Sequence, residues 1–230
     1  MVGGMTAPDS SLEIERKYAV DAGFVLPDLS AVPGVAAVTS PRTYHLTAVY
    51  HDTPGQRLAA ARITLRRRIG GTDSGWHLKL PAGADARREV HAPLGPGTEG
   101  VPAELAGLVS EQTGGEPLRP IARLQTTRTV RHLLDSAGQV LAEVADDEVT
   151  GSLPDQNSSK TEGPRDPDAW QTAIAWREVE IELARGTAGL LDAAGRLLLE
   201  AGARPSPAAS KLSLLLSAAG SRDGPASRHS

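Results

Sequence analysis

The sequence predicts an α+β fold that is mainly β: an eight-stranded antiparallel β-barrel with a charged lumen and helices packed outside. Two observations predict this fold. About eight segments are rich in β-branched residues or alternate between apolar and polar residues, whereas only three longer segments have helical spacing. Most links between the expected strands are short, which favours antiparallel pairing, and eight antiparallel strands can close into a barrel without free edges.

The expected strands follow one another along the chain with turn signals between them. Residues 70–75 are Gly, Thr, Asp and Ser and are typical of a hairpin turn, as is the segment 135–138. In chain order, the expected strands are 12–17, 42–52, 62–69, 76–80, 87–94, 121–134, 139–150 and 174–183.

Three helices are expected between or after these strands. The first covers 101–113 and has Pro102 near its start, where the missing N–H is tolerated. The second covers 187–201 and ends before Gly202, and the third covers 207–219 and begins at Ser206 or Pro207.

We expect a single domain over residues 12–219. Residues 1–11 lack the basic and apolar blocks of a signal peptide and are expected to form a disordered leader. Residues 152–169 contain almost no apolar side chains, so we expect a mobile insertion loop there. Residues 220–230 are polar and are expected to form a disordered tail.

Composition excludes several classes of protein. The 230 residues include no Cys, which excludes disulfides, thiolate zinc sites and a cysteine nucleophile. A net charge of −4 argues against a protein that coats nucleic acid. The longest apolar stretches fall far short of the roughly 20 residues that a membrane-spanning helix needs. We therefore expect a cytoplasmic monomer or homodimer that binds neither nucleic acid nor a membrane.

Charged residues on the expected strands are sorted by sign. Successive side chains point to opposite sides of a strand, so each set named below shares one face. The acidic sets are Glu13 and Glu15 (with Lys17), Glu143 and Asp147, and Glu178, Glu180 and Glu182; the basic sets are Arg62, Arg66 and Arg68, and His77 and Lys79. An ordinary barrel with a charged exterior is one interpretation, but charges that only met water would mix signs on each strand.

The sorting suits a site that binds a cation together with a polyanion. Carboxylates bind Mg²⁺ through oxygen, and Arg and Lys bind phosphate oxygens. If the three helices covered the apolar strand faces from outside, the charged faces would line the lumen, as they do in larger barrels that enclose polar cavities.

Six short motifs stand in order along the chain. They are Glu13-Ile14-Glu15-Arg16-Lys17, the pair of stretches 65–68 (LRRR) and 75–81 (GWHLKLP), Thr127-Arg128, Asp147-Glu148-Val149, Glu178-Val179-Glu180 and Ser210-Lys211. The first resembles the E-x-E-x-K signature of the CYTH superfamily, also called triphosphate tunnel metalloenzymes. The second resembles the L-R-x-R and W-x-L-K-x-P stretches of its thiamine triphosphatase branch. Together the motifs cover roughly residues 12 to 217, which is far more specific than any one motif.

The resemblance implies a tunnel enzyme that hydrolyses the terminal phosphate of inorganic triphosphate or of an organic triphosphate such as thiamine triphosphate. It implies that six basic residues bind the triphosphate: Lys17, Arg66, Arg68, Lys79, Arg128 and Lys211. It implies that five acidic residues hold one or two Mg²⁺ or Mn²⁺ ions: Glu13, Glu15, Asp147, Glu178 and Glu180. Lys17, Lys211 and Glu15 are the expected catalytic residues, with Lys211 capping the tunnel or protonating the leaving group.

Two other functions fit the same motifs. A class IV-type adenylate cyclase would use the same tunnel but must also hold adenine, and the sequence shows no dedicated base pocket. A non-catalytic module that binds polyphosphate or a nucleotide would need only the basic residues, whereas this chain also has the acidic ones. In this family the domain is often joined to a histidine-rich helical CHAD domain, which we do not expect within these 230 residues.

Three site assignments are also open. Alternation from Glu143 favours Asp147 over Asp146 as the inward residue, but a bulge would reverse this. Glu182 is a third candidate ligand on the last strand or a residue at the rim. His77 shares a face with Lys79, but an isolated histidine is more often packed or solvated than part of a site.

Overall fold

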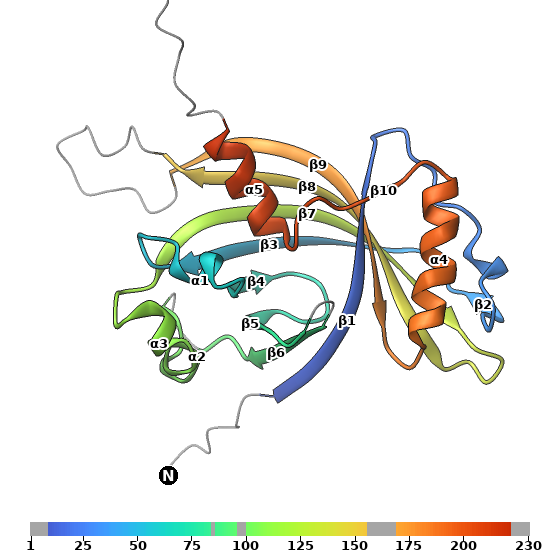
Figure 1. The fold of residues 1–230 in the computed structure, drawn as a ribbon, viewed down its shortest axis with the longest axis horizontal. Coiled ribbons are helices and arrows are strands. Elements are labelled where there is room, and N and C mark those ends of the chain that lie inside the picture. The colour runs from blue at the N-terminus through green and yellow to red at the C-terminus, as the bar shows by residue number, and fades with distance from the viewer. Residues whose placement is uncertain (1–8, 84–85, 96–99, 156–168, 222–230) are drawn as a thin grey trace, which may run out of the picture.

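The computed structural model describes residues 9–83, 86–95, 100–155 and 169–221. These residues form a closed antiparallel barrel whose circuit runs β1–β6–β5–β4–β3–β7–β8–β9 and returns to β1 (Figure 1). The barrel strands are β1 (Asp9–Val20), β3 (Arg42–Asp52), β4 (Thr64–Ile69), β5 (Gly75–Pro81), β6 (Ala86–Ala92), β7 (Arg119–Leu134), β8 (Val140–Pro154) and β9 (Trp170–Leu183). Two short strands extend the sheet: β2 (Ala37–Val38) pairs with β7, and β10 (Arg204–Pro205) pairs with β1.

Strand β1 closes the barrel because it changes partner half-way along. Residues up to Ile14 pair with β6, and residues from Glu15 onward pair with β9. In the second half, Lys17 lies opposite Glu180. The predicted barrel of eight antiparallel strands is therefore confirmed.

Several element boundaries differ from the prediction. Strand β1 begins at Asp9, inside the expected leader, and β8 runs to Pro154, inside the expected insertion loop. Strand β4 begins only at Thr64, because Arg62 adopts a left-handed backbone conformation (φ 60°) that a strand cannot include. Most of the expected leader, loop and tail (1–8, 156–168 and 222–230) lies outside the described residues, and Gly220 of the expected tail belongs to the last helix, α5 (Lys211–Gly220).

The described helices are the 3₁₀ turn η1 (Leu29–Ala31), α1 (Arg57–Ala60), α2 (Ala103–Leu108), α3 (Ser110–Thr113), α4 (Ala188–Glu200) and α5 (Lys211–Gly220). The predicted helix over 101–113 is interrupted at Val109, which separates α2 from α3. Helix α5 begins later than predicted, because Ser210 is its N-cap and forms a capping box with Ser213.

The apolar strand faces point outward and are covered by helices. Leu191 and Leu198 of α4 belong to one core cluster with Tyr18, Val179 and Ile181. A second cluster joins α1, α2 and the residue between α2 and α3 to β4, β5 and β6 through Leu58, Leu105, Val109, Leu65, Trp76, Leu78 and Val90. The expected inversion, with apolar faces outside and charged faces inside, is therefore what the barrel shows.

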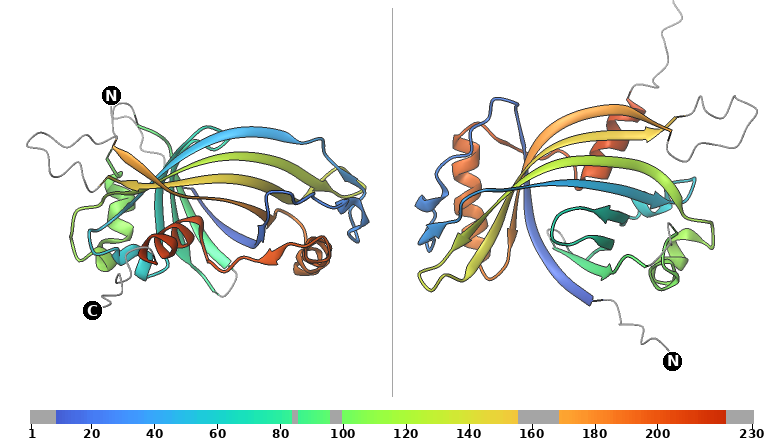
Figure 2. Two further views of the ribbon diagram at one scale, coloured as in Figure 1. Left: turned by 90° about the horizontal axis from the view of Figure 1, so that it is seen from above. Right: turned by 180° about the vertical axis from the view of Figure 1, so that it is seen from behind.

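Helix α5 is placed differently from α4, and the two lie well apart along the molecule (Figures 1 and 2). Leu212 and Leu215 of α5 pack with Leu124 and Val149. Because alternate residues share a strand face, Val149 lies on the same side of β8 as Asp147. Helix α5 therefore covers one end of the barrel interior and brings its first residue to the charged lumen. Among the described residues, no helix has the length and apolar character needed to cross a membrane.

The contact between α4 and β1 depends on a missing side chain. A Cβ at Gly195 would overlap the hydroxyl of Tyr18 and lie 3.2 Å from its Cζ, and Tyr18 is buried with its ring held in the core. We expect Gly195→Ala to lower the free energy of unfolding by about 1–3 kcal/mol, because overpacking outweighs the gain in helix propensity. Denaturant unfolding measures this.

Gly189→Ala is the matched control in the same helix. Its Cβ would meet only Thr187 Oγ1, at an ordinary contact distance of 3.6 Å. We expect this variant to be neutral or slightly stabilised. Equal stability of the two variants would contradict the packing described here.

Candidate functional site

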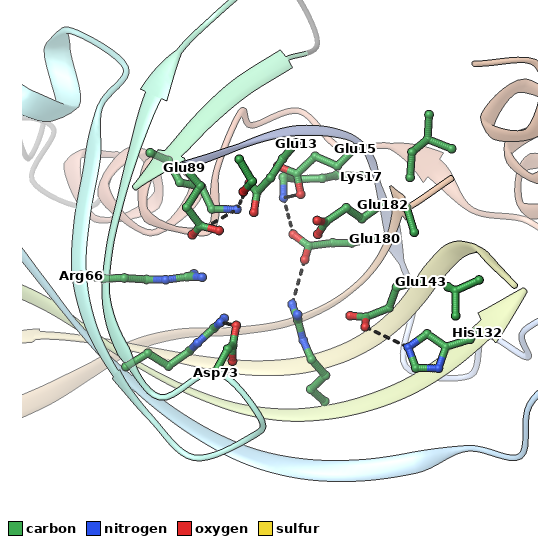
Figure 3. A pocket seen from close by; sticks show the side chains of 17 residues that line it. Glu13, Glu15, Lys17, Arg66, Asp73, Glu89, His132, Glu143, Glu180 and Glu182 are labelled. Carbon is green, nitrogen blue, oxygen red and sulfur yellow. Dashed lines mark hydrogen bonds and ion pairs between the residues drawn. The ribbon is translucent and has the colours of Figure 1, made fainter. Parts of the chain in front are cut away.

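A cavity of about 430 Å³ lies inside the barrel, and most of its lining side chains are charged (Figure 3). Eight of the residues predicted from the sequence line it: Glu13, Glu15, Lys17, Arg66, Arg68, Lys79, Arg128 and Glu180. The other three predicted residues, Asp147, Glu178 and Lys211, are buried beside it: Asp147 pairs with Arg128, and Lys211 pairs with Glu178 and Glu180. The structure thus brings the predicted residues together, in two adjoining groups.

Guanidinium groups form one wall of the cavity. Arg66 and Arg68 lie on β4 and Arg128 on β7, with β3 between these strands. Arg66 Nη1 lies 3.3 Å from Tyr50 Oη, and the buried Nε of Arg66 has no hydrogen-bond partner. No carboxylate among the described residues forms an ion pair with Arg66.

The three guanidinium groups of this wall lie close enough to repel one another. Burial lowers the pKa of Arg68 to about 9, and the nearby charges of Arg66 and Arg128 act in the same direction. Arg68 pairs with Asp73, a half-exposed residue in the turn between β4 and β5. Because like charges crowd each other here, an anion in the cavity would be stabilised.

Three buried carboxylates lie together beside Arg128. They belong to Asp147 on β8 and to Glu178 and Glu180 on β9, and one oxygen of each lies within 4.8 Å of the others. Lys211 Nζ lies 2.9 Å from Asp147 Oδ2, 2.7 Å from Glu178 Oε1 and 2.8 Å from Glu180 Oε1. We call these three carboxylates the acidic trio.

Local structure explains how the acidic trio and Lys211 meet. Asp147 and Glu178 are cross-strand partners, and Glu178 and Glu180 share a face of β9 because they are two residues apart. The capping box at Ser210 fixes the first turn of α5 and so the position of Lys211. Trp176 Nε1 donates to Glu178 Oε2 at 2.6 Å and orients that carboxylate.

Basic neighbours keep most of the acidic trio ionised. Burial alone would raise the pKa of Glu180, but the charges of Lys17, Lys211 and Arg128 hold it well below its usual value. The pKa of Asp147 is also lowered, by Lys211 and Arg128 against the effect of burial. The pKa of Glu178 is raised, because burial outweighs its contact with Lys211.

Glu13 and Glu15 are not members of the acidic trio, although Glu15 shares the Lys17 ammonium with Glu180. Glu15 accepts a hydrogen bond from Lys17 Nζ at 2.8 Å, and the same ammonium contacts Glu180 (Figure 3). Glu13 pairs with Lys79. Burial, and after it a hydrogen bond with Glu89, raises the pKa of Glu13 to about 8. The five predicted metal ligands are thus one compact group and one looser pair.

The acidic trio fits a divalent cation that prefers oxygen ligands. All three donors are carboxylates, and all three residues are buried. Mg²⁺ and Mn²⁺ are bound by such carboxylates in proteins, whereas softer metals prefer nitrogen or sulfur. The acidic trio therefore fits a divalent metal ion. A bound ion would take the place that the Lys211 ammonium occupies between the three carboxylates.

Among the lining residues that were not predicted as site residues are Glu89, Glu143 and His132. Glu89 on β6 lines the cavity, and His77 Nδ1 lies 2.9 Å from its Oε1. The alternation with buried Val90 and Ala92 would have placed Glu89 inward. Glu143 and His132 form a half-exposed pair, with 3.3 Å between Oε2 and Nε2.

The structure places each of the three residues that the sequence leaves open. Asp147 faces inward, whereas Asp146 faces outward and pairs with Arg177, as alternation predicts. Glu182 lines the cavity. His77 is buried and bonded to Glu89 and to the Asp73 carbonyl, so it is a packed histidine.

Arg62 is not on the wall with Arg66 and Arg68. The sequence places it on their strand face, but it precedes β4 and does not line the lumen cavity.

The buried imidazole of His77 gives a pH prediction. Burial lowers its pKa to about 4, although the hydrogen bond to Glu89 opposes the shift. Between about pH 6.5 and 4 the unfolded chain therefore binds a proton that the folded chain does not, so stability falls as the pH falls. We expect His77→Gln to lose up to about 3 kcal/mol less stability than the wild type over this pH range.

Unfolding free energies at pH 7 and pH 4.5 measure this difference. His45→Gln, at an exposed histidine, is the control and should lose as much stability as the wild type between the two pH values. If the unfolding free energy of His77→Gln depended on pH as strongly as that of the wild type, burial of the His77 imidazole would not be the cause of the loss.

The acidic trio gives a second prediction. Removing the ammonium in Lys211→Met leaves three buried carboxylates short of one cation, which should cost about 3–5 kcal/mol at pH 7. Millimolar Mg²⁺ or Mn²⁺ should restore much of this stability, because an ion bound only by the folded chain stabilises it. Arg177→Met, which removes the partner of the outward Asp146, is the matched control and should show no rescue. Equal metal effects on the two variants would argue against a metal site here.

Comparisons with known proteins agree with this geometry. The chain matches the CYTH domain over residues 11–209. It is 42% identical over 215 residues to the uncharacterized proteins Rv2226 and MT2285 of Mycobacterium tuberculosis; the match covers 92% of this chain but 41% of theirs, so the chain spans less than half the length of these relatives. Its fold resembles the crystal structure of a "putative adenylate cyclase" from Bacillus halodurans, with a TM-score of 0.58 and 18% identity over 88% of this chain and 96% of that one. The chain belongs to the CYTH domain family.

Proposed function

We propose that the chain is a metal-dependent phosphohydrolase that removes the terminal phosphate of inorganic triphosphate or of an organic triphosphate such as thiamine triphosphate. The observation that carries the proposal is the guanidinium wall, in which Arg66 has no carboxylate partner among the described residues, beside a compact group of carboxylates. A polyanion and a metal ion would neutralise these two groups together, and phosphoryl transfer requires both.

The basic residues have distinct tasks in this proposal. Arg66, Arg68 and Arg128 would bind phosphate oxygens, because a planar guanidinium matches them with two parallel hydrogen bonds. Lys17 on β1 and Lys79 on β5 also line the cavity and would add point charges. Arg66 is the strongest candidate, since its Nε is buried without a hydrogen-bond partner and it has no carboxylate partner among the described residues.

The acidic trio would hold Mg²⁺ or Mn²⁺, with Glu13 and Glu15 as candidates for a second ion. When bound, such an ion polarises the phosphoryl group and lowers the pKa of a water ligand. In the reaction, the oxygen of water bonds to the terminal phosphorus, and the bridging oxygen leaves with the electron pair of the broken P–O bond. The carboxylate of Glu15, whose pKa is lowered by Lys17 against the effect of burial, would accept the proton that the water loses.

The two catalytic lysines act as fixed charges rather than as acids. Burial would lower the pKa of Lys17, but ion pairs with Glu180 and Glu15 raise it above the usual lysine value. The acidic trio likewise raises the pKa of Lys211 against the effect of burial. Both ammonium groups thus keep their protons at neutral pH. Lys17 would stabilise the charge that develops on the leaving oxygen, and the expectation that Lys211 protonates it loses support.

The adenylate cyclase alternative has less support from the lining of the cavity. His132 is the only ring side chain among the described residues that line it, so little is available to stack on adenine. The similarity to the Bacillus halodurans protein, at 18% identity, concerns the fold.

Neighbouring arginines on β4 provide a matched test. Arg66 lines the cavity, whereas Arg67 lies on the opposite face of the same strand. We expect Arg66→Ala to lower kcat/KM for triphosphate by about a hundredfold, the usual cost of losing a donor to transition-state charge, and Arg67→Ala to leave it nearly unchanged. Orthophosphate release is measured with Mg²⁺ and with Mn²⁺.

A panel of substrates separates the alternatives. The panel is inorganic triphosphate, thiamine triphosphate and ATP, with orthophosphate, pyrophosphate and cyclic nucleotide measured as products. Orthophosphate release that needs a divalent metal supports the proposal. Pyrophosphate and cyclic AMP from ATP would instead support a cyclase, and tight binding without any product would support a binding module.

A further inference from the structure

A second cavity, of about 510 Å³, adjoins the barrel where the segment after β10 passes β1. Glu15 and Lys17 line both this cavity and the lumen cavity, so their side chains lie between the two. The other charged residues of its wall are Arg16 on β1, Arg62 before β4 and Arg87 on β6. Figure 1 shows β10 beside β1, on the path from α4 to α5.

The basic residues of this second cavity are only partly neutralised. Arg16 pairs with Asp192 at 2.5 Å, and Lys17 pairs with Glu15 and Glu180. Arg62 and Arg87 have no carboxylate partner within the part of the chain that the structure describes.

Arg87 is held in place but keeps free donors. Its Nη1 donates to the Arg62 carbonyl at 3.3 Å, and its Nη2 donates to the Ala209 carbonyl at 3.0 Å. A guanidinium has five N–H donors, so Arg87 can still bind an anion. These two hydrogen bonds also position Arg62 and the segment that leads into α5.

The backbone of Arg62 is in a conformation that suits glycine. Arg62 follows the end of α1 and has a φ of 60°. Its N–H donates to the Ala59 carbonyl at 2.9 Å, and the Ile63 N–H donates to the Leu58 carbonyl at 2.8 Å. This is the Schellman pattern, in which the left-handed residue is usually glycine because a Cβ is strained there. A strained arginine at such a position points to a use for its side chain.

We propose that Arg62 and Arg87 form a second anion site, separate from the lumen site, that takes a phosphate group. Two guanidinium groups without carboxylate partners match phosphate oxygens, and the nearest carboxylate in the cavity, that of Glu15, is occupied by Lys17. The identity of the ligand rests on the proposed function: the phosphate group belongs either to orthophosphate released in the lumen or to the far end of a longer phosphate chain.

The position of Arg62 allows a test that keeps the protein folded. Arg62→Gly removes the guanidinium and relieves the backbone, so its Tm should equal or exceed that of the wild type. Gln56→Gly is the matched control, because Gln56 also has a positive φ (55°) but does not line the cavity.

The binding experiment uses orthophosphate as the probe, titrated calorimetrically without divalent metal into the full chain. We expect two sites in the wild type. Arg62→Gly should weaken one of them by about tenfold, the cost of a charge-assisted contact, while Gln56→Gly keeps both. Arg66→Ala should weaken the other site. The same stoichiometry and affinities in Arg62→Gly as in the wild type would overturn the proposal, and so would loss of all binding in Arg66→Ala.

Kinetics then identify the source of the phosphate group and separate this proposal from the proposed function. Weaker inhibition by orthophosphate in Arg62→Gly identifies the released product, and weaker binding of long-chain polyphosphate identifies a chain end. If the wild type hydrolyses no triphosphate but its second orthophosphate site depends on Arg62, the proposed function fails and the anion site stands. If the wild type hydrolyses triphosphate but binds no orthophosphate through Arg62, the anion site fails and the proposed function stands.

Discussion

The Glu180 carboxylate is the interaction on which the rest of the structure depends. It receives Lys17 from β1, Arg128 from β7 and Lys211 from α5, so three elements meet at one side chain. The pair with Lys17 lies at the β1–β9 junction that closes the barrel. Burying charges costs more than most ion pairs return, so such a cluster is weak evidence of selection for stability alone. It is better explained by a lumen that must hold charged ligands.

Much of the fold follows from local patterns in the sequence. Alternation predicts which face of each strand is charged, and it places Asp147, rather than Asp146, inside. The sorting of sign by strand predicts a lumen that can hold a polyanion and a cation. Eight of the eleven predicted site residues line one cavity, and the other three lie against it.

What the sequence could not predict depends on contacts between distant residues. The division of the acidic residues into a trio and a separate pair is set by barrel register, because Glu15 lies opposite Glu182 whereas Glu178 lies opposite Asp147. The capture of Lys211 by the trio depends on the packing of α5 over the barrel end. Arg62 leaves the strand face that alternation assigns to it because the Schellman turn of α1 determines its backbone.

The central claim is that the lumen separates a metal site from a phosphate-binding wall. Diffraction from crystals soaked with Mn²⁺ and a slowly hydrolysed triphosphate analogue tests it most directly. The account predicts an anomalous manganese peak in contact with Asp147, Glu178 and Glu180, with Lys211 displaced, and phosphate density against Arg66, Arg68 and Arg128. Manganese elsewhere with Lys211 still bound in the acidic trio, or phosphates that avoid Arg66, would contradict it.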